Sequence, residues 1–376
     1  YSYNPDFLIP LPQRNAYVGN PKFGYSFFPP AVARQPEPFA IPAEKAPGAY
    51  RIFVLGSSAA LGDPEPSYGV ARVLEVMLRE SFPAARFEVY NVAMVAINSH
   101  AILPIVRACA SMNPDLFVVY MGNNEVVGPF GVGSVFAGYS PSLRAIRASL
   151  QMRRLRLVQA LQNLFASWSN GSDEFSEWKG MEFFLDRQVA ADDPRLSDVY
   201  EHFRENLNDV CAAANAAGAH TLLCTLAINL KDCAPFASRH RPDLAENNLA
   251  RWDELYQAGI ALENDGRAGE ALEFYQQAAA IDAAFADLQF RMGRCALSLE
   301  DYDEARSHLV RARDFDALRF RADSRINAII REYAASSPPR VQLVDAEQII
   351  ADSGVHPSRI PGREVLYEHC HLNFQG

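Results

Sequence analysis

The sequence predicts an α/β fold, a three-layer arrangement around a parallel sheet with an all-α helical module inserted into it. Two observations support this prediction. Apolar runs typical of buried strands alternate with segments of helical period from residue 50 onward, and such alternation indicates a parallel sheet covered by helices on both faces. Beyond residue 250 the pattern changes to small residues that recur every 34 positions, which indicates paired helices.

Residues 1–49 precede the alternation. They are rich in proline and aromatic residues and have neither a helical nor an alternating period, so we expect an extended arm that lies across a domain or leads away from an anchor. The elements that follow are expected as strands at 50–55, 87–92, 116–120, 220–226 and 340–344, and as helices at 68–82, 100–111 and 197–217.

The helical module has a period of 34, which is the period of tetratricopeptide (TPR) repeats. The small residues that recur are Gly259 and Gly293, Ala271 and Ala305, and Ala278 and Ala312. Helices near 241–256 and 322–335 are expected to cap the repeats. The module either only stabilises the main domain, or it forms a docking surface or a wall of the active site. We therefore expect one main domain made of two parts, 50–240 and 336–376, with a TPR-like insertion at 241–335 between them.

The large side chains of this module have an expected role as well. We expect Trp252, Leu255, Tyr275 and Phe290 to fill the space between the helices. Small residues at the recurring positions would let the two helices of each hairpin approach closely. The combination predicts closely packed helix pairs.

Composition narrows the class of protein. A formal charge of −10 and a pI near 5.4 argue against a nucleic-acid partner, whose binding surface would be basic. The six cysteines lack the spacing of a metal site, so we expect buried free thiols and neither a metal nor another cofactor. His202, His240 and His308 also lack metal-ligand spacing, and we expect them at the surface. No apolar run reaches the roughly 18–20 residues of a membrane helix.

The segment 142–165 has a helical period and is strongly basic. A basic amphipathic helix can lie on an anionic membrane surface. It can also form a solvated face that pairs with acidic residues elsewhere, and the acidic composition of the chain favours this second interpretation. The basic residues are Arg144, Arg147, Arg153, Arg154 and Arg156.

The strongest chemical signal follows the first predicted strand. The apolar run that begins at Arg51 ends at Gly56, and Ser58 comes two residues later, followed by small residues and Gly62. Open α/β sheets bind ligands at the carboxyl ends of their strands, so the Ser58 hydroxyl would lie at that edge. A helix that begins there offers backbone N–H groups to an oxyanion. Ser58 is a candidate nucleophile, although a serine in this position often only caps a helix.

Three further segments carry suitable groups. Asn91–Ser99 contains small residues that allow a tight turn after the second strand, and Asn124 follows the third strand. An amide at a strand end can donate to an oxyanion, where one donor is worth about 2.7–4 kcal/mol, although Asn also forms ordinary turns. Near the chain end, Glu368 precedes His371 by three positions, a spacing that lets a carboxylate orient an imidazole.

These four segments, in this order, resemble the four sequence blocks of the SGNH (GDSL-type) hydrolase family, whose domain is a three-layer, flavodoxin-like α/β sandwich. The resemblance covers the chain from about residue 50 onward, apart from the helical module. It implies that Ser58 is the nucleophile, His371 the general base and Glu368 the residue that orients it. It also implies that the Asn124 amide and backbone N–H groups, including that of Ala96, form the oxyanion hole.

The chain departs from the family pattern at three of these positions. Ser57 stands where the family has an acidic residue, Ala96 where it has a glycine, and Glu368 where it has an aspartate. A backbone N–H donor survives the change at Ala96. A glutamate is one methylene longer than an aspartate, so the backbone around Glu368 must shift to keep the same contact.

The chain looks closest to a bacterial subgroup of this family that carries TPR insertions and usually a membrane anchor at the N-terminus. That likeness implies an extracytoplasmic location, in the periplasm or cell envelope, with a membrane tether before Tyr1. Two other classes of site are excluded. The α/β-hydrolase elbow would need a glycine at Ala60, and the glycines near Ser134 are too closely spaced for a phosphate loop and lack its lysine.

The sequence therefore predicts a serine esterase or O-acyltransferase that forms an acyl-enzyme on Ser58. Its substrate would be a small-molecule or glycan ester, such as an acetylated carbohydrate, or a lipid. The loop Val127–Phe136 is expected to shape the acyl pocket. Arg319 and Arg321 either bind a substrate carboxylate or pair with nearby acids. The alternative function is a catalytically reduced scaffold whose TPR-like module docks a protein partner, for example in a membrane complex.

Overall fold

The computed structural model describes residues 3–161, 180–336 and 340–376. The chain divides into two compact units, each assembled from separate stretches of sequence. The first unit comprises Tyr1–Asp186, Arg195–Leu226 and Ile326–Asp345, and the second comprises Arg187–Pro194, Ala227–Arg325 and Ala346–Gly376. The expected organisation was one main domain made of 50–240 and 336–376, with 241–335 inserted between its two parts, whereas residues 227–240 and 346–376 belong here to the second unit.

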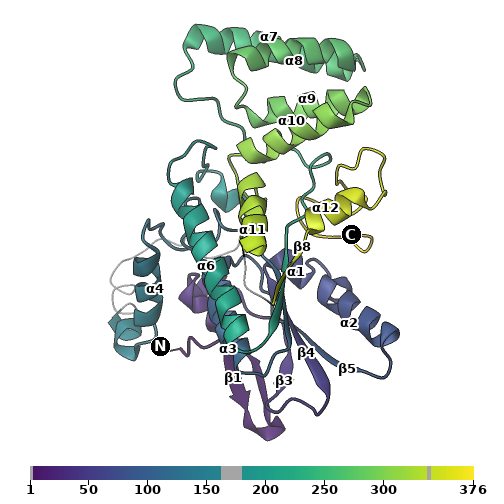
Figure 1. Ribbon diagram of the computed structural model, residues 1–376. Coiled ribbons are helices and arrows are strands. Elements are labelled where there is room, and N and C mark those ends of the chain that lie inside the picture. The colour runs from purple at the N-terminus through teal and green to yellow at the C-terminus, as the bar shows by residue number, and fades with distance from the viewer. Residues whose placement is uncertain (1–2, 162–179, 337–339) are drawn as a thin grey trace. The chain divides into compact units, whose positions relative to one another are not determined.

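The first unit is built on a five-stranded parallel sheet with the order β5-β4-β6-β7-β8 (Figure 1). This confirms the predicted α/β fold. The predicted strands agree with the observed ones to within two residues at each end. The observed strands are β4 Ala49–Gly56, β5 Arg86–Asn91, β6 Leu116–Tyr120, β7 His220–Cys224 and β8 Val341–Val344.

The core of this sheet lies along β4, which pairs with a strand on each side. From Arg51 to Gly56 every residue of β4 is buried, as is typical of a parallel strand covered on both faces. The Phe53 ring stacks on Tyr90 of β5 and Phe117 of β6, with centroids 5.6 and 5.7 Å apart. The buried guanidinium of Arg51 is neutralised by Glu88, at 2.8 Å.

The helices of the first unit connect these strands. α3 packs against α6, and α2 packs against β5. We expected residues 322–335 to cap the repeats, but from Ile326 onward this helix, α11, belongs to the first unit. The reason is that the Asn327 amide hydrogen-bonds both the N–H and the carbonyl of Leu226, each at 2.9 Å. The helices are α1 Ser58–Leu61, α2 Val70–Ser81, α3 Ser99–Ala110, α4 Leu143–Met152, α6 Leu196–Ala216 and α11 Ser324–Ser336.

The N-terminal region is more ordered than the expected extended arm. It forms a three-stranded antiparallel sheet of β1 Leu8–Leu11, β2 Ala16–Gly19 and β3 Ala40–Pro42. Strands of three or four residues are too short to display an alternating period, and prolines lie within β1 and β3. Both of these are edge strands, where proline is tolerated.

The basic segment is not one continuous helix, because residues 143–152 and 156–161 are helical and a turn separates them. α4 ends at Met152, and the chain turns there; residues 162–165 lie outside the described part. Arg147 pairs with Asp209 at 3.0 Å, and Arg154 pairs with Asp6. Two of the five arginines therefore pair with acidic side chains, in the way that the second interpretation of this segment expects.

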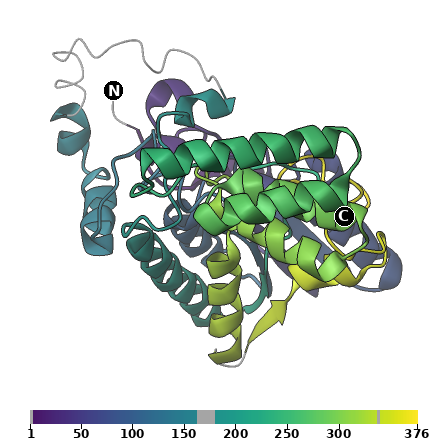
Figure 2. The ribbon, with the colours of Figure 1, turned by 90° about the horizontal axis from the view of Figure 1, so that it is seen from above.

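The helical repeats of the second unit form two helix pairs (Figure 1), and α7 and α8 also lie side by side when seen from above (Figure 2). A Cβ on Gly259 would lie 2.4 Å from the Tyr275 ring, and one on Gly293 would lie 2.6 Å from Leu309. The 34-residue period therefore marks the closest approach in each pair. The helices are α7 Glu246–Asn264, α8 Ala268–Ile281, α9 Ala286–Ser298 and α10 Tyr302–Phe315.

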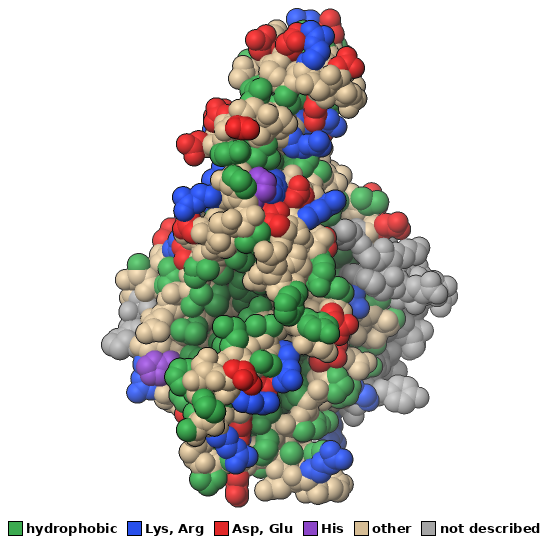
Figure 3. Space-filling view, turned by 90° about the vertical axis from the view of Figure 1, so that its right-hand side faces the viewer, with side chains coloured by type: hydrophobic (Ala, Val, Ile, Leu, Met, Phe, Trp, Pro, Cys, Tyr) green, Lys and Arg blue, Asp and Glu red, His purple; other side chains and the backbone are tan. Residues whose placement is uncertain are grey.

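The expected first cap, 241–256, is the first part of α7 and not a separate helix. Trp252, Leu255 and Tyr275 form the core of the repeats, as predicted, and Phe290 is also buried. Acidic and basic side chains are intermixed on the repeat surface in Figure 3. Several of them pair, as Arg291 does with Glu263 at 2.9 Å.

The cysteines agree with the sequence-based expectation, and two of the three histidines do not. The described cysteines are free and mostly buried, as expected. The surface assignment is wrong for His202 and His308, which are 6% and 4% exposed, because each imidazole has polar partners in the interior. His308 Nδ1, for example, lies 2.8 Å from the side chain of Gln289. None of the described helices is long and apolar enough to cross a membrane.

Candidate active site

Ser58 is the first residue of α1, immediately beyond the carboxyl end of β4. Gly56 has φ +155° and lies so close to the next strand that a Cβ there would come within 2.0 Å of the Tyr120 carbonyl oxygen. Only glycine fits at this point, and the chain can then turn from strand to helix within two residues. Gly62, with φ +92°, ends the helix and donates its N–H to the Ser58 carbonyl at 3.0 Å. Ser58 is half-buried at the edge of the sheet.

Ala96 lies in the loop after β5 and has the left-handed conformation, with φ +61°. The resemblance aligns this position with a glycine, and the backbone explains why glycine would suit it. A left-handed alanine costs roughly 1–2 kcal/mol. The loop runs beside the end of β4, because the Val92 N–H donates to the Val54 carbonyl at 3.0 Å and the Met94 N–H to the Gly56 carbonyl at 3.3 Å.

Asn124 lies in the loop after β6, and its amide donates to the Ile97 carbonyl at 3.1 Å. An amide nitrogen has two N–H bonds, so one donor remains for an oxyanion. The backbone carbonyl of Asn124 accepts a hydrogen bond from the Gly128 N–H at 2.7 Å, and this bond closes a turn. Because β5, β4 and β6 are neighbours in the sheet, Ser58, Ala96 and Asn124 all lie at its carboxyl edge.

Glu125 is a buried carboxylate that the sequence did not single out. It accepts hydrogen bonds from the Ser99 N–H at 2.9 Å and the Ser99 hydroxyl at 2.7 Å. Ser99 in turn accepts from the Asn206 amide at 3.0 Å. Burial raises the pKa of Glu125 to about 7, although both bonds from Ser99 lower it. This carboxylate connects the loop that carries Asn124 to the start of α3, directly after the Ala96 loop.

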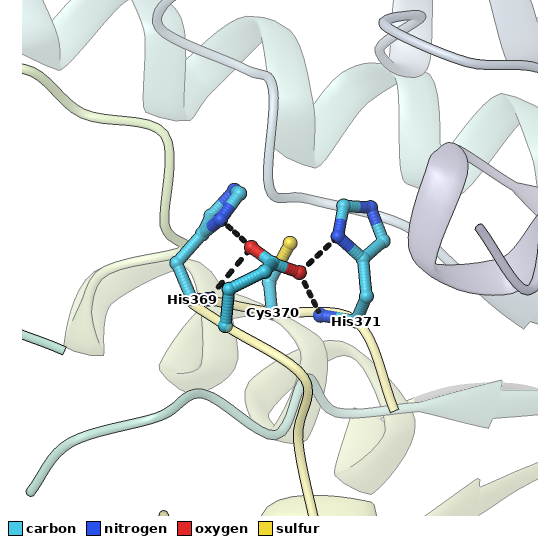
Figure 4. Close-up of side chains that lie close together, drawn as sticks. His369, Cys370 and His371 are labelled. Carbon is cyan, nitrogen blue, oxygen red and sulfur yellow. Dashed lines mark hydrogen bonds and ion pairs between the residues drawn. The ribbon is translucent and has the colours of Figure 1, made fainter. Parts of the chain in front are cut away.

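The other predicted site residues lie in the second unit, in a turn near the chain end. His371 Nδ1 contacts one oxygen of the Glu368 carboxylate, and the His371 backbone N–H donates to the same oxygen at 3.2 Å. The two imidazoles, His369 and His371, lie on opposite sides of this carboxylate (Figure 4). Glu368 and His371 are therefore brought together as predicted, despite the longer side chain.

The same turn is supported by residues that the sequence analysis missed. Asn229 is fully buried; its amide donates to the Glu368 carbonyl at 2.7 Å, and its N–H donates to the His369 carbonyl at 3.0 Å. The His369 ring packs against Phe236 and Phe320, and its Nδ1 contacts the second carboxylate oxygen of Glu368. Burial lowers the pKa of His369 to about 3, with a smaller effect of His371 and Arg321, so the ring is neutral.

This turn also has the donor types of a metal site. One ligand atom from each of Glu368, His369, Cys370 and His371 lies within 4.8 Å of the others. Imidazole, thiolate and carboxylate are the ligands that Zn²⁺ prefers in proteins. Both imidazoles already contact the carboxylate, so the same groups serve equally as a hydrogen-bonded pair of the kind that orients a catalytic base.

The two candidate arginines have structural partners. Arg319 pairs with Asp323 and Arg321 with Asp316, each at 2.9 Å, and all four side chains are buried. Arg321 also donates to the Asn229 carbonyl at 3.2 Å. Pairing with nearby acids, the second of the two expected roles, is therefore what the structure contains.

The predicted site residues thus form two groups. Ser58, Ala96 and Asn124 lie together in the first unit, and Glu368 and His371 lie together in the second. Asn229 belongs to no motif, and Glu125 follows Asn124 in the third segment without an expected role, because the contacts of both residues are with partners far away in the sequence. In the sequence, each of them is visible only as a polar residue that lies next to an apolar run.

Comparison with known proteins bears mainly on the helical module. The family model described as "Tetratricopeptide repeat" matches residues 264–324. A crystal structure of TesA is 20% identical to this chain and covers 46% of it and 76% of the TesA chain, with a TM-score of 0.22. No curated protein matches the chain. Residues 264–324, which contain α8, α9 and α10, are therefore similar to a tetratricopeptide repeat region.

Proposed function

We propose that this protein is a serine hydrolase of the SGNH type, an esterase or an O-acyltransferase that forms an acyl-enzyme on Ser58. The observation that carries the proposal is the arrangement at the carboxyl edge of the sheet. There a serine at a helix start lies on the same edge as the left-handed backbone of Ala96 and the amide of Asn124. These groups are a nucleophile and the donors of an oxyanion hole.

In the proposed reaction, Ser58 attacks the carbonyl carbon of an ester. His371 removes the hydroxyl proton and returns it to the leaving alcohol, so that the alcohol departs and an acyl-enzyme remains. Glu368, through its contact with His371 Nδ1, fixes the tautomer in which Nε2 can accept this proton. Asn124 and the N–H groups of Ser58 and Ala96 stabilise the oxyanion. Water then resolves the acyl-enzyme in an esterase, and a carbohydrate hydroxyl does so in an acyltransferase.

The proposal requires the two units to bring Ser58 and His371 into hydrogen-bond reach. The resemblance to the SGNH blocks supports this requirement, because it assigns both residues to one site. It also supports an extracytoplasmic location for the protein, with an acetylated carbohydrate or a lipid ester as substrate.

Labelling with a fluorophosphonate probe, measured by intact mass, tests the proposal. We expect one adduct on the wild-type protein and none on Ser58→Ala or His371→Gln. The matched control is Ser57→Ala, because Ser57 is the neighbouring serine and its side chain makes no capping hydrogen bond. An adduct that survives in Ser58→Ala, or no adduct on folded wild-type protein, would contradict the proposal.

The second candidate function is a scaffold. The tetratricopeptide match at residues 264–324 favours it, since such repeats commonly bind other proteins, and so do the departures at Ser57 and Ala96. A scaffold would keep its protein partner when Ser58 is replaced by alanine and would give no fluorophosphonate adduct. The labelling experiment therefore separates the two functions.

A further inference from the structure

A cavity of about 100 Å³ lies in the first unit, and the residues that line it do not include Ser58, Ala96 or Asn124. Its walls come from the N-terminal region, α3, α4 and α6. Part of the wall is apolar, formed by side chains such as Phe23, Phe27 and Leu103. Arg107, Arg147 and Arg154 provide its cationic part. A cavity that combines an apolar wall with a few convergent polar groups is the usual form of a small-molecule site.

The charges around this cavity do not balance. Arg147 and Arg107 share a single carboxylate, that of Asp209, at 3.0 and 3.6 Å. Arg154 pairs with Asp6. These are the ion pairs that the three arginines make among the described residues, and none of the described residues that line the cavity is acidic. Three guanidinium groups thus face two carboxylates, which leaves one positive charge for a ligand.

The hydrogen bonds at the cavity determine which atoms are donors. The Asn206 carbonyl oxygen accepts from Arg147 at 3.0 Å, so the Asn206 nitrogen faces Ser99 and His100. An amide nitrogen only donates, so His100 Nδ1, 3.1 Å away, must accept. Burial lowers the pKa of His100 to about 3, helped by His202 and Arg147, and the ring is neutral. Its single proton is therefore on Nε2.

This assignment leaves two donors without an acceptor. His100 is 7% exposed and lines the cavity, and its Nε2–H has no hydrogen-bond partner among the described residues. The Nε–H of Arg147 is also buried without an acceptor in the described part of the chain. A buried donor without a partner costs about 1–3 kcal/mol, so an acceptor beside the Arg147 Nε–H is favoured.

We propose that this cavity binds a small monocarboxylate with a short apolar tail. The carboxylate oxygens accept from His100 Nε2–H and from the arginines, whose planar guanidinium groups match a carboxylate geometrically. The tail packs against the apolar wall. One negative charge on the ligand neutralises the one excess positive charge of the wall.

Isothermal titration calorimetry with sodium butyrate tests this site, with butyramide as the neutral analogue of the same size. The Ser58→Ala variant is used as well as wild type, so that the result does not depend on any hydrolytic activity. We expect butyrate to bind both proteins, and butyramide to bind at least tenfold more weakly, because it lacks the charge. Inorganic phosphate binding more tightly than butyrate would overturn the assignment to a monocarboxylate.

The variants Arg147→Gln and Arg107→Gln should each weaken butyrate binding about tenfold or more, the loss expected for a charged hydrogen bond. Arg107 is largely exposed, so its variant folds even if Arg147→Gln does not. The matched control is Arg144→Gln, an exposed arginine on α4 that does not line the cavity, and its affinity should stay within twofold of wild type. Equal losses in Arg144→Gln and Arg107→Gln would mean that only the general surface charge attracts butyrate.

A nuclear magnetic resonance titration gives a second readout. In protein labelled with ¹⁵N-histidine, butyrate should shift the Nε2 resonance of His100 and leave that of the exposed His220 unchanged. Binding heat without a shift at His100 would place butyrate elsewhere and overturn the proposal, and so would the absence of both signals in folded protein.

Discussion

Glu125 accepts two hydrogen bonds from one residue, Ser99: the backbone N–H donates at 2.9 Å and the hydroxyl at 2.7 Å. The bonds join the loop after β6 to the first turn of α3. A further bond from the Asn98 amide to the Pro129 carbonyl, at 2.9 Å, joins the same two segments. The backbone of Ala96 and the amide of Asn124 are therefore held in a fixed relation by buried polar contacts.

Replacing Glu125 by glutamine should change how stability depends on pH. The pKa of Glu125 is raised to about 7 by burial, above its ordinary value of 4.5, so between these values the folded protein keeps a proton that the unfolded chain releases. The free energy of unfolding should fall as pH rises through this window, by up to about 1.4 kcal/mol per pH unit. Glu125→Gln should lose this contribution, as measured by urea unfolding at pH 5, 6 and 7.

Glu80→Gln is the matched control for that prediction, since Glu80 is exposed on α2. The free energy of unfolding of Glu80→Gln should change with pH as steeply as that of the wild type. A Glu125→Gln protein with the wild-type slope would show that Glu125 ionises normally in the folded state.

Asn124→Ala should lower kcat of the proposed hydrolase by about 10²–10³-fold with little change in KM, because an oxyanion donor acts mainly in the transition state. Steady-state kinetics on a chromogenic acetate ester measures both constants. The midpoint of thermal unfolding is the control, since the amide also bonds the Ile97 carbonyl. Unchanged kcat would remove Asn124 from the oxyanion hole.

Ala96→Gly should stabilise the protein by about 0.5–1 kcal/mol. Glycine relieves the left-handed strain at φ +61° and loses part of that gain through the greater freedom of the unfolded chain. Denaturant unfolding measures the change. Ala108→Gly in the last turn of α3 is the control and should destabilise by up to about 1 kcal/mol. Destabilisation by both changes would mean that the Ala96 side chain has packing that outweighs the strain.

His369→Gln should make the second unit less sensitive to acid. The pKa of His369 is lowered to about 3, below its ordinary 6.5, so between these values the unfolded chain binds a proton that the folded protein does not. Stability should therefore fall as pH falls through this window, by about 1.4 kcal/mol per pH unit, and the variant should lose that contribution. Urea unfolding between pH 4 and 6.5 measures it, with exposed His220→Gln as the control.

Arg321→Met should destabilise the protein by about 3–5 kcal/mol, because Asp316 would remain buried without its cation. The double variant Arg321→Met, Asp316→Asn should recover part of this loss, as measured by thermal unfolding. If Arg321 bound substrate and had no structural role, the single variant would raise KM and leave the unfolding midpoint unchanged.

The elements that the sequence predicted well are those whose signal is local. The strand 116–120 was predicted at its exact bounds, because an apolar run between two turns has few other solutions. Gly259 and Gly293 were predicted as close-packing positions because the period itself carries the information. The order of the segments with Ser58 and Asn124 was enough to assign them to one edge of the sheet.

The features that were missed depend on distant partners. Glu125 contacts Ser99, 26 residues away, and Asn229 contacts the turn at Glu368, 139 residues away, and no local pattern contains such a pair. His202 was expected at the surface because a helical period gives no indication of what covers that face. The short strands before residue 43 escaped detection because prolines interrupt them.

The pairing of β8 with β7 has a consequence for synthesis of the protein. Thr221 of β7 pairs with Val341 of β8, so β8 cannot join the sheet until the ribosome has produced all of the repeats between them. His371 follows later still. A nascent chain that stops early carries Ser58 but no imidazole at position 371, so in the proposed enzyme reactivity toward esters would begin only when translation is nearly complete.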